Sequence, residues 1–395
     1  VYLETSTMTE LYDSGIDGIA GGHYSISTGI ELALLSKYVK EGRATKDMTF
    51  YLKKDVDISV QSLSDLEDGW VPIGYDYSTT DPDTYTRSFR GTFDGCGYTV
   101  SGLYIYDERG DNVGLFGRVR GGTIKNLGVM GGIVGEYNCG GIVGDLDDGA
   151  VITCWAAVRI QSESDTGGIA GRIDNSTIEN CASYGAYLAY GGETSNAGGI
   201  FGDALGKSVV KNCYYTDGTS EAAYNSASKN TTITDLLSFT YGFENDDYYC
   251  TLERAVTIDE VTTTSALDAL NAWVYSQGNG QYCTWYNSNV IISVENGVSG
   301  HFPVLKNPQE LGGSDPGDYS GDYTATATVS QLYKSRTDGI EGACYSINGL
   351  DDLEAFRKYV NAGYKTKNII FFLTRDIDMS VTYSVDSSKS WIPIG

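Results

Sequence analysis

The chain of 395 residues lacks several features on which common protein activities depend. It has no run of 18 apolar residues, so the sequence predicts no membrane-spanning helix. Lys and Arg number 27 against 52 Asp and Glu, and the net charge of −25 argues against binding to nucleic acid or to an anionic membrane surface. Eight Cys without a C-x-x-C pair exclude a disulfide scaffold and a zinc or redox motif built on such a pair.

Glycine and tyrosine, in contrast, are abundant, with 50 and 31 copies. Gly is typical of turns and Tyr of strands, so the composition favours turn-rich β structure. The acidic surface is expected to serve mainly solubility, and we predict no cofactor beyond weak Ca²⁺ binding. The opening residues, VYLETSTMTE, carry neither an initiator Met nor a signal-peptide pattern, so we expect the chain to be a piece of a longer protein.

A tandem repeat relates the two ends of the sequence. WVPIG at 70–74 returns as WIPIG at 391–395, a shift of 391 − 70 = 321 residues. Under this shift, residues 1–74 align without a gap on 322–395, and 31 of 74 pairs are identical. The sequence therefore predicts one module followed by the opening of a second. The signature of the repeat is Trp70, Pro72 and Gly74, matched by Trp391, Pro393 and Gly395.

A shorter repeat runs through the middle of the module. Four Gly-rich tetrads, GLFG, GIVG, GIAG and GIFG, begin at 114, 141, 168 and 199, with spacings of 27, 27 and 31 residues. Each tetrad is followed by a β-prone marker such as TIKNL or TIENC. A period near 27 suits one coil of a parallel β-helix, in which equivalent side chains of successive coils stack in ladders. The predicted fold class is an all-β solenoid.

Aligning the coils predicts four ladders. An aliphatic ladder should point inward, and an Asn ladder should lie at a bend, where Asn tolerates the left-handed backbone conformation. The last Gly of each tetrad is expected to take positive φ at a tight corner, where a Cβ would also strike the next coil. A Cys ladder is close enough for a disulfide by distance, but we favour packing as small hydrophobic side chains, because stacked Cβ atoms point parallel. The members are Ile142, Ile169 and Ile200; Asn126, Asn180 and Asn212; Gly117, Gly144, Gly171 and Gly202; and Cys154, Cys181 and Cys213.

These segments resemble a known family. FDGCGYTVSGLYI (93–105), GLFGRVRGGTIKNLGV (114–129) and the Gly-Ile-x-Gly units followed by Asn-Cys look like the GLUG-type repeats of secreted and cell-surface bacterial proteins. The resemblance covers about residues 48–215 and implies a right-handed β-helix and an extracellular location. Such repeats also occur in IgA-cleaving peptidases, whose activity depends on a His-Glu-x-x-His zinc motif. Here neither His23 nor His301 is followed by Glu, so peptidase activity is not carried over.

The remaining segments divide the module into a body with two caps. An amphipathic helix is predicted at 28–41, with Thr28 as its N-cap and Glu31 placed as in a capping box. Such a helix would cover the open end of the first coil. The predicted segments are an N-terminal cap (1–47), the parallel β-helix (48–215), a mixed C-terminal cap (216–305, with a helix at 264–277), a linker (306–321) and the cap and first strand of a second, truncated copy (322–395).

Candidate chemistry rests on acidic and aromatic residues. Asp55 and Asp57, repeated as Asp376 and Asp378, could do acid-base work or hold Ca²⁺, but we favour Asp residues that accept backbone N–H groups at a bend. GDLDDG at 144–149 has the composition of a Ca²⁺ loop without its spacing, so an Asp-rich turn is preferred. Aromatic residues of the C-terminal cap could stack on sugars, although burial is preferred. They are Tyr214, Tyr215, Tyr248, Tyr249, Trp285 and Tyr286.

The sequence as a whole predicts a non-enzymatic, structural or adhesive segment of an extracellular tandem-repeat protein on the bacterial surface. The expected partners are neighbouring copies of the module and host or bacterial surface glycans or proteins, with no nucleic acid and no membrane span. Two alternatives stay open. One is a β-helix that binds or degrades polysaccharide, and the other is a self-assembling filament subunit in which 322–395 docks on a neighbouring chain.

Overall fold

The computed structural model divides the chain into two compact units, Val1–Leu311 (unit 1) and Gly312–Gly395 (unit 2). No helix in the described part of the chain is long and apolar enough to cross a membrane. The described residues are 4–59, 69–74, 87–189, 196–216, 226–244, 247–278, 281–288, 291–292, 300–305, 327–336, 344–348, 350–362, 364 and 370–373.

Unit 1 is built mainly of strands. Its described helices are α1 (Met8–Asp13), α2 (Gly29–Lys40) and α3 (Ala266–Gln277). Its described strands are β1 (Ser6–Thr7), β2 (His23–Ile26), β3 (Thr49–Leu52), β4 (Val56–Asp57), β5 (Thr92–Asp94), β6 (Thr99–Tyr106), β7 (Phe116–Arg120), β8 (Thr123–Lys125), β9 (Gly128–Val134), β10 (Tyr137–Gly140), β11 (Val143–Asp147), β12 (Ala150–Ile152), β13 (Trp155–Ser162), β14 (Ser164–Gly167), β15 (Ala170–Asp174), β16 (Thr177–Glu179), β17 (Ala182–Ser183), β18 (Ala186–Ala189), β19 (Ala197–Gly198), β20 (Phe201–Leu205), β21 (Val209–Thr216), β22 (Ser226–Ala227), β23 (Thr232–Glu244), β24 (Asp247–Ile258), β25 (Val261–Ser265), β26 (Trp285–Asn287) and β27 (Pro303–Leu305).

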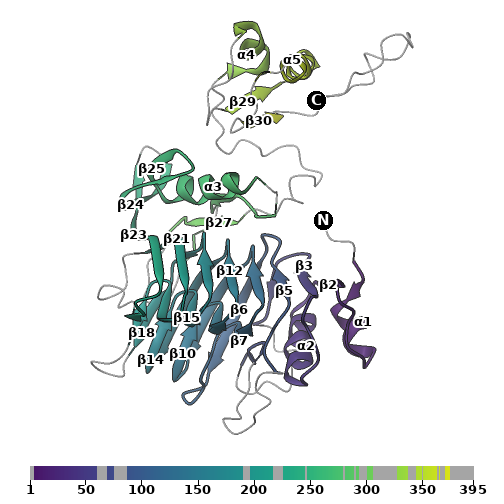
Figure 1. Cartoon of the computed structure of the whole chain (residues 1–395), viewed down its shortest axis with the longest axis vertical. Helices are drawn as coiled ribbons and strands as arrows, with labels where there is room; N and C mark the ends of the chain where they lie inside the picture. Colours follow the sequence, from purple (N-terminus) through teal and green to yellow (C-terminus); the bar gives the residue numbers. More distant parts are fainter. Residues whose placement is uncertain are drawn as a thin grey trace. The chain divides into compact units, whose positions relative to one another are not determined.

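These strands stack as a parallel β-helix, which confirms the predicted fold class (Figure 1). A first row contains β1, β2, β3, β5, β8, β12, β16, β21 and β23, each parallel to the next. A second row contains β7, β11, β15, β20 and β22, and a third contains β10, β14 and β19. Phe116 pairs with Val143 and Val143 pairs with Ala170, so paired residues of the regular coils are 27 positions apart. The period read from the sequence is therefore the length of one coil.

Corners between the rows are columns of residues in the left-handed backbone conformation. Asn126, Asn180 and Asn212 share one corner, with φ of 52°, 56° and 51°. Thr153 fills the place of Asn in the coil between Asn126 and Asn180, with φ of 53°. The other two columns are Asn112, Asn138 and Asp165, and Gly121, Asp148, Asn175 and Gly206.

The tetrad glycines have a different role from the expected one. Gly117, Gly144, Gly171 and Gly202 lie in strands of the second row and do not take positive φ, so the predicted left-handed corner is wrong for them. A Cβ on Gly144 would overlap the backbone of Asn112 in the preceding coil, and a Cβ on Gly171 would overlap that of Asn138. Glycine is required because neighbouring coils approach closely, while Asn and Asp supply most of the left-handed corners.

The interior of the solenoid is filled by stacked apolar side chains. Ile142, Ile169 and Ile200 are fully buried there, in one aliphatic ladder. Ile142 N donates to Ile169 O at 3.0 Å, and Ile169 N donates to Ile200 O at 2.9 Å, so the ladder and the backbone hydrogen bonds share one register. The coils nearer the N-terminus add a cluster of aromatic rings from Phe50, Phe89, Phe93 and Phe116.

The first three strands of the first row are connected by helices. The predicted helix is present as α2, and Thr28 Oγ1 accepts from Glu31 N at 3.2 Å at its N-terminus. Glu31 Oε2 accepts from Ser27 N at 2.7 Å rather than from the N-cap N–H, so the expected capping box is only half formed. The buried face of α2 consists of Leu32, Leu35, Ser36, Tyr38 and Val39.

Residues after the regular coils extend the solenoid and also cover one of its faces. β22 and β23 pair in parallel with β20 and β21, so stacking continues beyond residue 215, where the coils were expected to end. β24 and β25 then run antiparallel. We call the described residues between 247 and 305 the C-terminal strap. Its helix α3 packs with outward-facing Trp155 and Tyr214 of the solenoid in one hydrophobic cluster.

Unit 2 repeats the opening of unit 1 element by element. Its elements are β28 (Ala327–Thr328), α4 (Val329–Ser335), β29 (Cys344–Ile347), α5 (Leu350–Asn361) and β30 (Ile370–Leu373), which begin 321 residues after β1, α1, β2, α2 and β3. A complete capping box starts both α1, which is not among the elements expected from the sequence, and α4. The sequence repeat is thus also a structural repeat. Trp391, Pro393, Gly395, Asp376, Asp378 and the predicted linker at 306–321 lie outside the described residues.

Candidate functional site: polar columns along the coils

Charged side chains form a line along the second row of strands. Backbone pairing aligns Arg118 of β7, Asp145 of β11, Arg172 of β15 and Asp203 of β20, which we call the charge ladder. The sign of the charge alternates from each rung to the next. Neighbouring rungs are one coil apart, so the inner rungs lie between two opposite charges.

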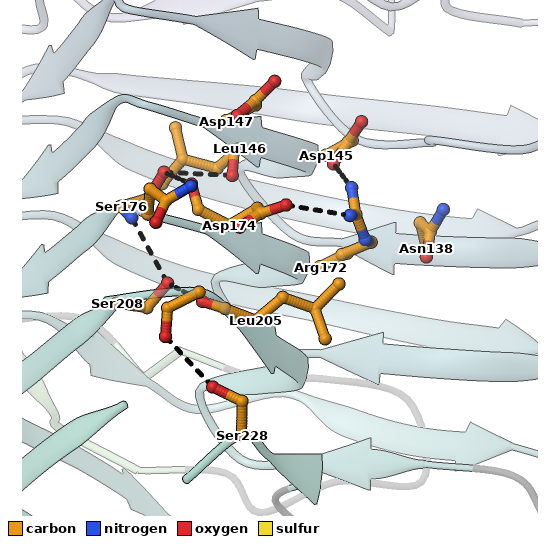
Figure 2. A network of polar contacts seen from close by, with 12 residues as sticks. Asn138, Asp145, Leu146, Asp147, Arg172, Asp174, Ser176, Leu205, Ser208 and Ser228 are labelled. Carbon is orange, nitrogen blue, oxygen red and sulfur yellow. Dashed lines mark hydrogen bonds and ion pairs between the residues drawn. The ribbon is translucent and has the colours of Figure 1, made fainter. Parts of the chain in front are cut away.

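The contacts within the charge ladder are short and partly buried (Figure 2). Arg118 Nε lies 3.1 Å from Asp145 Oδ2, and Arg172 Nη1 lies 2.9 Å from Asp145 Oδ1. Arg172 Nη2 also lies 3.2 Å from Asp174 Oδ2. Burial alone would lower the pKa of Arg172, but Asp145 and its acidic neighbours raise it, so the guanidinium stays charged. Two arginines offset the cost of burying the Asp145 carboxylate.

Serine side chains fix the corner beside the charge ladder. Ser176 Oγ donates to Leu146 O at 3.0 Å, one coil earlier, and Ser176 N donates to Ser208 Oγ at 3.2 Å, one coil later. Ser228 Oγ donates to Gly206 O at 3.0 Å in the following step (Figure 2). The serines therefore join each coil to its neighbours at a place where the backbone turns.

Asn126, Thr153, Asn180 and Asn212 form a second, buried ladder, which we call the Asn column. Asn180 Nδ2 donates to Thr153 Oγ1 at 3.2 Å, and Asn212 Nδ2 donates to Asn180 Oδ1 at 2.6 Å. A buried amide without a partner would destabilise the fold by about 1–3 kcal/mol. The hydrogen bonds between coils are what allow this column to be buried.

The Asn column also binds the C-terminal strap. Asn126 Nδ2 donates to Gln281 O at 2.9 Å, and Cys283 N donates to Asn126 Oδ1 at 2.9 Å. Asn212 Nδ2 lies 3.5 Å from Ala269 O of α3. The residues that shape this corner of each coil therefore also hold a segment that lies far away in the sequence.

The Cys ladder lies inside the coils. Cys154, Cys181 and Cys213 are buried free thiols. The sulfur of Cys181 lies 3.6 Å from Val151 O, and that of Cys213 lies 3.6 Å from Ile178 O. Burial raises the pKa of the Cys181 and Cys213 thiols well above the ordinary value, which keeps both sulfurs protonated. The geometry is that of packed small side chains.

The acidic candidates accept local hydrogen bonds. Ser59 Oγ and Ser59 N donate to Asp57 Oδ1 at 2.6 Å and 2.8 Å, and these bonds lower the pKa of Asp57. Thr99 N donates to Asp55 Oδ1 at 2.8 Å. Within GDLDDG, Asp148 occupies a left-handed corner, whereas Asp145 and Asp147 lie in β11 and pair with arginines. The described part of the chain holds no group of three or more His, Cys, Asp or Glu that could bind a metal ion.

Aromatic residues assigned to the C-terminal cap divide between buried and exposed positions. Tyr214 and Trp285 are buried, and Tyr215 is half-buried. Tyr249 and Tyr286 are 42% and 38% exposed. The side chain of Tyr248 lies outside the described part of the structure. Burial in the cap therefore accounts for some of these residues and not for all.

The first Trp-Pro-Gly signature joins α2 to the first regular coil. Trp70 Nε1 donates to Leu115 O at 3.0 Å, and Ser36 Oγ of α2 donates to Pro72 O at 3.3 Å. Gly74 has φ of 86°, and a Cβ there would overlap the backbone oxygen of Arg118. The signature thus marks the passage from the helical cap to the coils.

The charge ladder is the main feature that the sequence prediction missed. Its signal is present, because Arg118, Asp145 and Arg172 are 27 residues apart, the spacing of the first three tetrads. Charged residues aligned on the coil period would have revealed the alternating signs. Contacts of the Asn column with the strap leave no such signal, because they join residues 155 or more positions apart.

Fold and polar columns together define a β-helical protein with tandem modules. No family model matches the chain, and no solved structure matches it. A stretch of 134 residues, 34% of the chain, is 30% identical to a Gly-rich membrane protein of Evansella cellulosilytica, of which it covers 14%. A stretch of 145 residues is 26% identical to halomucin of Haloquadratum walsbyi, of which the match covers 2%. The chain thus spans only a small part of either relative.

Proposed function

We propose that the chain is a structural and adhesive segment of a long extracellular tandem-repeat protein, and that it is not an enzyme. The observation that carries the proposal is the construction of the solenoid from contacts between neighbouring coils. The charge ladder, the serines and the Asn column each join one coil to the next. A solenoid of this kind grows by adding coils without enlarging its core.

Length is the property that such a segment supplies. The first row has nine described strands, and eight steps of about 4.8 Å make a rod on the order of 40 Å for one module. A second copy of the opening elements begins 321 residues later, so further modules would lengthen the reach in equal steps. Reach of this kind suits a protein that holds a binding surface away from a cell.

Similarity to a Gly-rich membrane protein and to halomucin supports placing the segment at the cell surface. We include in the proposal a bacterial source and the relationship to GLUG-type repeats. Its partners would be neighbouring modules and surface glycans or proteins. Polysaccharide cleavage has less support, because Asp55 and Asp57 accept hydrogen bonds from nearby Ser and Thr residues. Release of unsaturated sugars by the chain, abolished in Asp57→Ala, would replace our proposal with a lyase.

Electron microscopy of a protein with several consecutive modules tests the proposal. Elongated particles whose length rises with the number of modules are the expected result, and compact globules would contradict it. Deletion of 322–395 from the present chain examines the filament alternative. If the intact chain forms filaments and the deletion variant is monomeric, assembly by docking takes the place of a covalent array.

A further inference from the structure

Two neighbouring tyrosines remain open to solvent on the outer face of the solenoid. Tyr104 and Tyr106 of β6 are 59% and 51% exposed, more than any other tyrosine in the described part of the chain. Leu103 and Ile105 alternate with them and are buried. Both tyrosine rings therefore stand on the outward side of one strand, roughly 6.6 Å apart along it.

The C-terminal strap covers an adjacent part of the same sheet and stops short of these rings. Outward-facing Trp155 and Ala157 of β13 belong to the hydrophobic cluster of the strap. Two residues further along β13, Arg159 pairs with Gly132 of β9, which in turn pairs with Tyr104. In the described structure, the line through Tyr104 is not part of the strap cluster.

Glycine borders Tyr104 on both neighbouring segments. A Cβ on Gly132 would meet only Arg159 O, at 3.8 Å, so the space beside the ring is open there. On the other side, Gly69 pairs with Ile105, and a Cβ on Gly69 would overlap the Tyr104 backbone. Tyr106 Oη donates to Glu108 Oε1 at 2.6 Å, which fixes the second ring. The pair is thus accessible and held in position.

We propose that Tyr104 and Tyr106 form a binding platform for a neutral polysaccharide. Exposed tyrosine faces offer apolar area to the faces of sugar rings, and their hydroxyl groups offer hydrogen bonds at the same place. Two rings on one strand can contact successive parts of one chain. The net charge of −25 opposes acidic glycans and nucleic acids, which leaves neutral glycans as the matching class. This inference rests on the proposed adhesive role and names the ligand class for it.

Affinity gel electrophoresis of the full chain tests the platform. Separate gels would contain laminarin, hydroxyethyl cellulose, yeast mannan or the acidic polygalacturonate. At least one neutral polysaccharide should retard the native protein, and polygalacturonate should not. The double variant Tyr104→Ala/Tyr106→Ala should bind at least about tenfold more weakly, because both stacking surfaces are lost. Tyr249→Ala/Tyr286→Ala is the matched control, since it removes two exposed tyrosines elsewhere and should leave binding unchanged.

Three outcomes would overturn the platform. They are no retardation in any neutral gel, retardation only by polygalacturonate, or equal retardation of the double Ala variant and the native chain. Tyr104→Phe/Tyr106→Phe keeps the rings and should still bind, so loss of binding in this variant would also count against stacking. If the Ala variant does not fold, Tyr104→Thr/Tyr106→Thr, which suits a strand, replaces it. Elongated multi-module particles that bind no neutral polysaccharide would refute the platform and leave the rod proposal standing.

Discussion

Asn180 allows the contribution of the Asn column to stability to be measured. Its buried side chain donates to Thr153 and accepts from Asn212. Asn180→Ala removes both hydrogen bonds, worth about 1 kcal/mol each, and leaves the Asn212 amide with only a long contact of 3.5 Å to Ala269 O, which costs about 1 kcal/mol more. Alanine at φ of 56° adds about 1 kcal/mol of backbone strain. The free energy of unfolding should fall by about 4 kcal/mol.

Two companion variants separate the backbone contribution from the hydrogen bonds. Asn180→Gly loses the same bonds but tolerates the left-handed conformation, so it should be about 1 kcal/mol more stable than Asn180→Ala. Thr153→Asn places a tolerant residue where a β-branched one now has φ of 53°, and it should raise stability by about 1 kcal/mol. Urea unfolding followed by tryptophan fluorescence gives all three values. A loss below about 1 kcal/mol for Asn180→Ala, or a glycine variant less stable than the alanine variant, would refute the reasoning.

Three further predictions concern the charge ladder, the thiols and unit 2. Arg172→Met leaves buried Asp145 with one arginine and should lower the free energy of unfolding by about 1–3 kcal/mol, whereas Arg254→Met, which breaks an exposed pair with Asp235, should cost under about 1 kcal/mol; equal losses would contradict the ladder. Unfolding without reductant should release at least two free thiols among Cys154, Cys181 and Cys213 in a thiol titration mapped by mass spectrometry, and fewer would show a disulfide. Burial alone would raise the pKa of Asp352, but hydrogen bonds from Ser330 and Asn348 lower it, so its stabilising contribution is present above about pH 4 and is lost as pH falls through the folded pKa. Hydrogen-exchange protection of residues 344–362 in the full chain should therefore fall below about pH 4, and a protection that does not change down to pH 2 would contradict this.

How much could be predicted from the sequence depends on whether a feature recurs with the coil. The backbone must turn at the same place every 27 residues, so Asn126, Asn180 and Asn212 recur and reveal both the period and the corner. Gly144 and Gly171 recur as well, but the letter alone does not say whether glycine is needed for positive φ or for close approach. Only the coordinates of the neighbouring coil decide between these two reasons, and here they favour close approach.

The strap shows why the remaining contacts could not be predicted. Its contacts with Asn126 come from Gln281 O and Cys283 N, two backbone groups whose side chains carry no information about the pairing. A corner Asn needs its amide only to support the turn, and in an uncovered solenoid water would satisfy that amide. Once the strap excludes water, the same amide must find protein partners, and the backbone of the strap supplies them for Asn126. The Asn column therefore serves a local requirement that repeats and a distant one that does not, and only the first is visible as a pattern in the sequence.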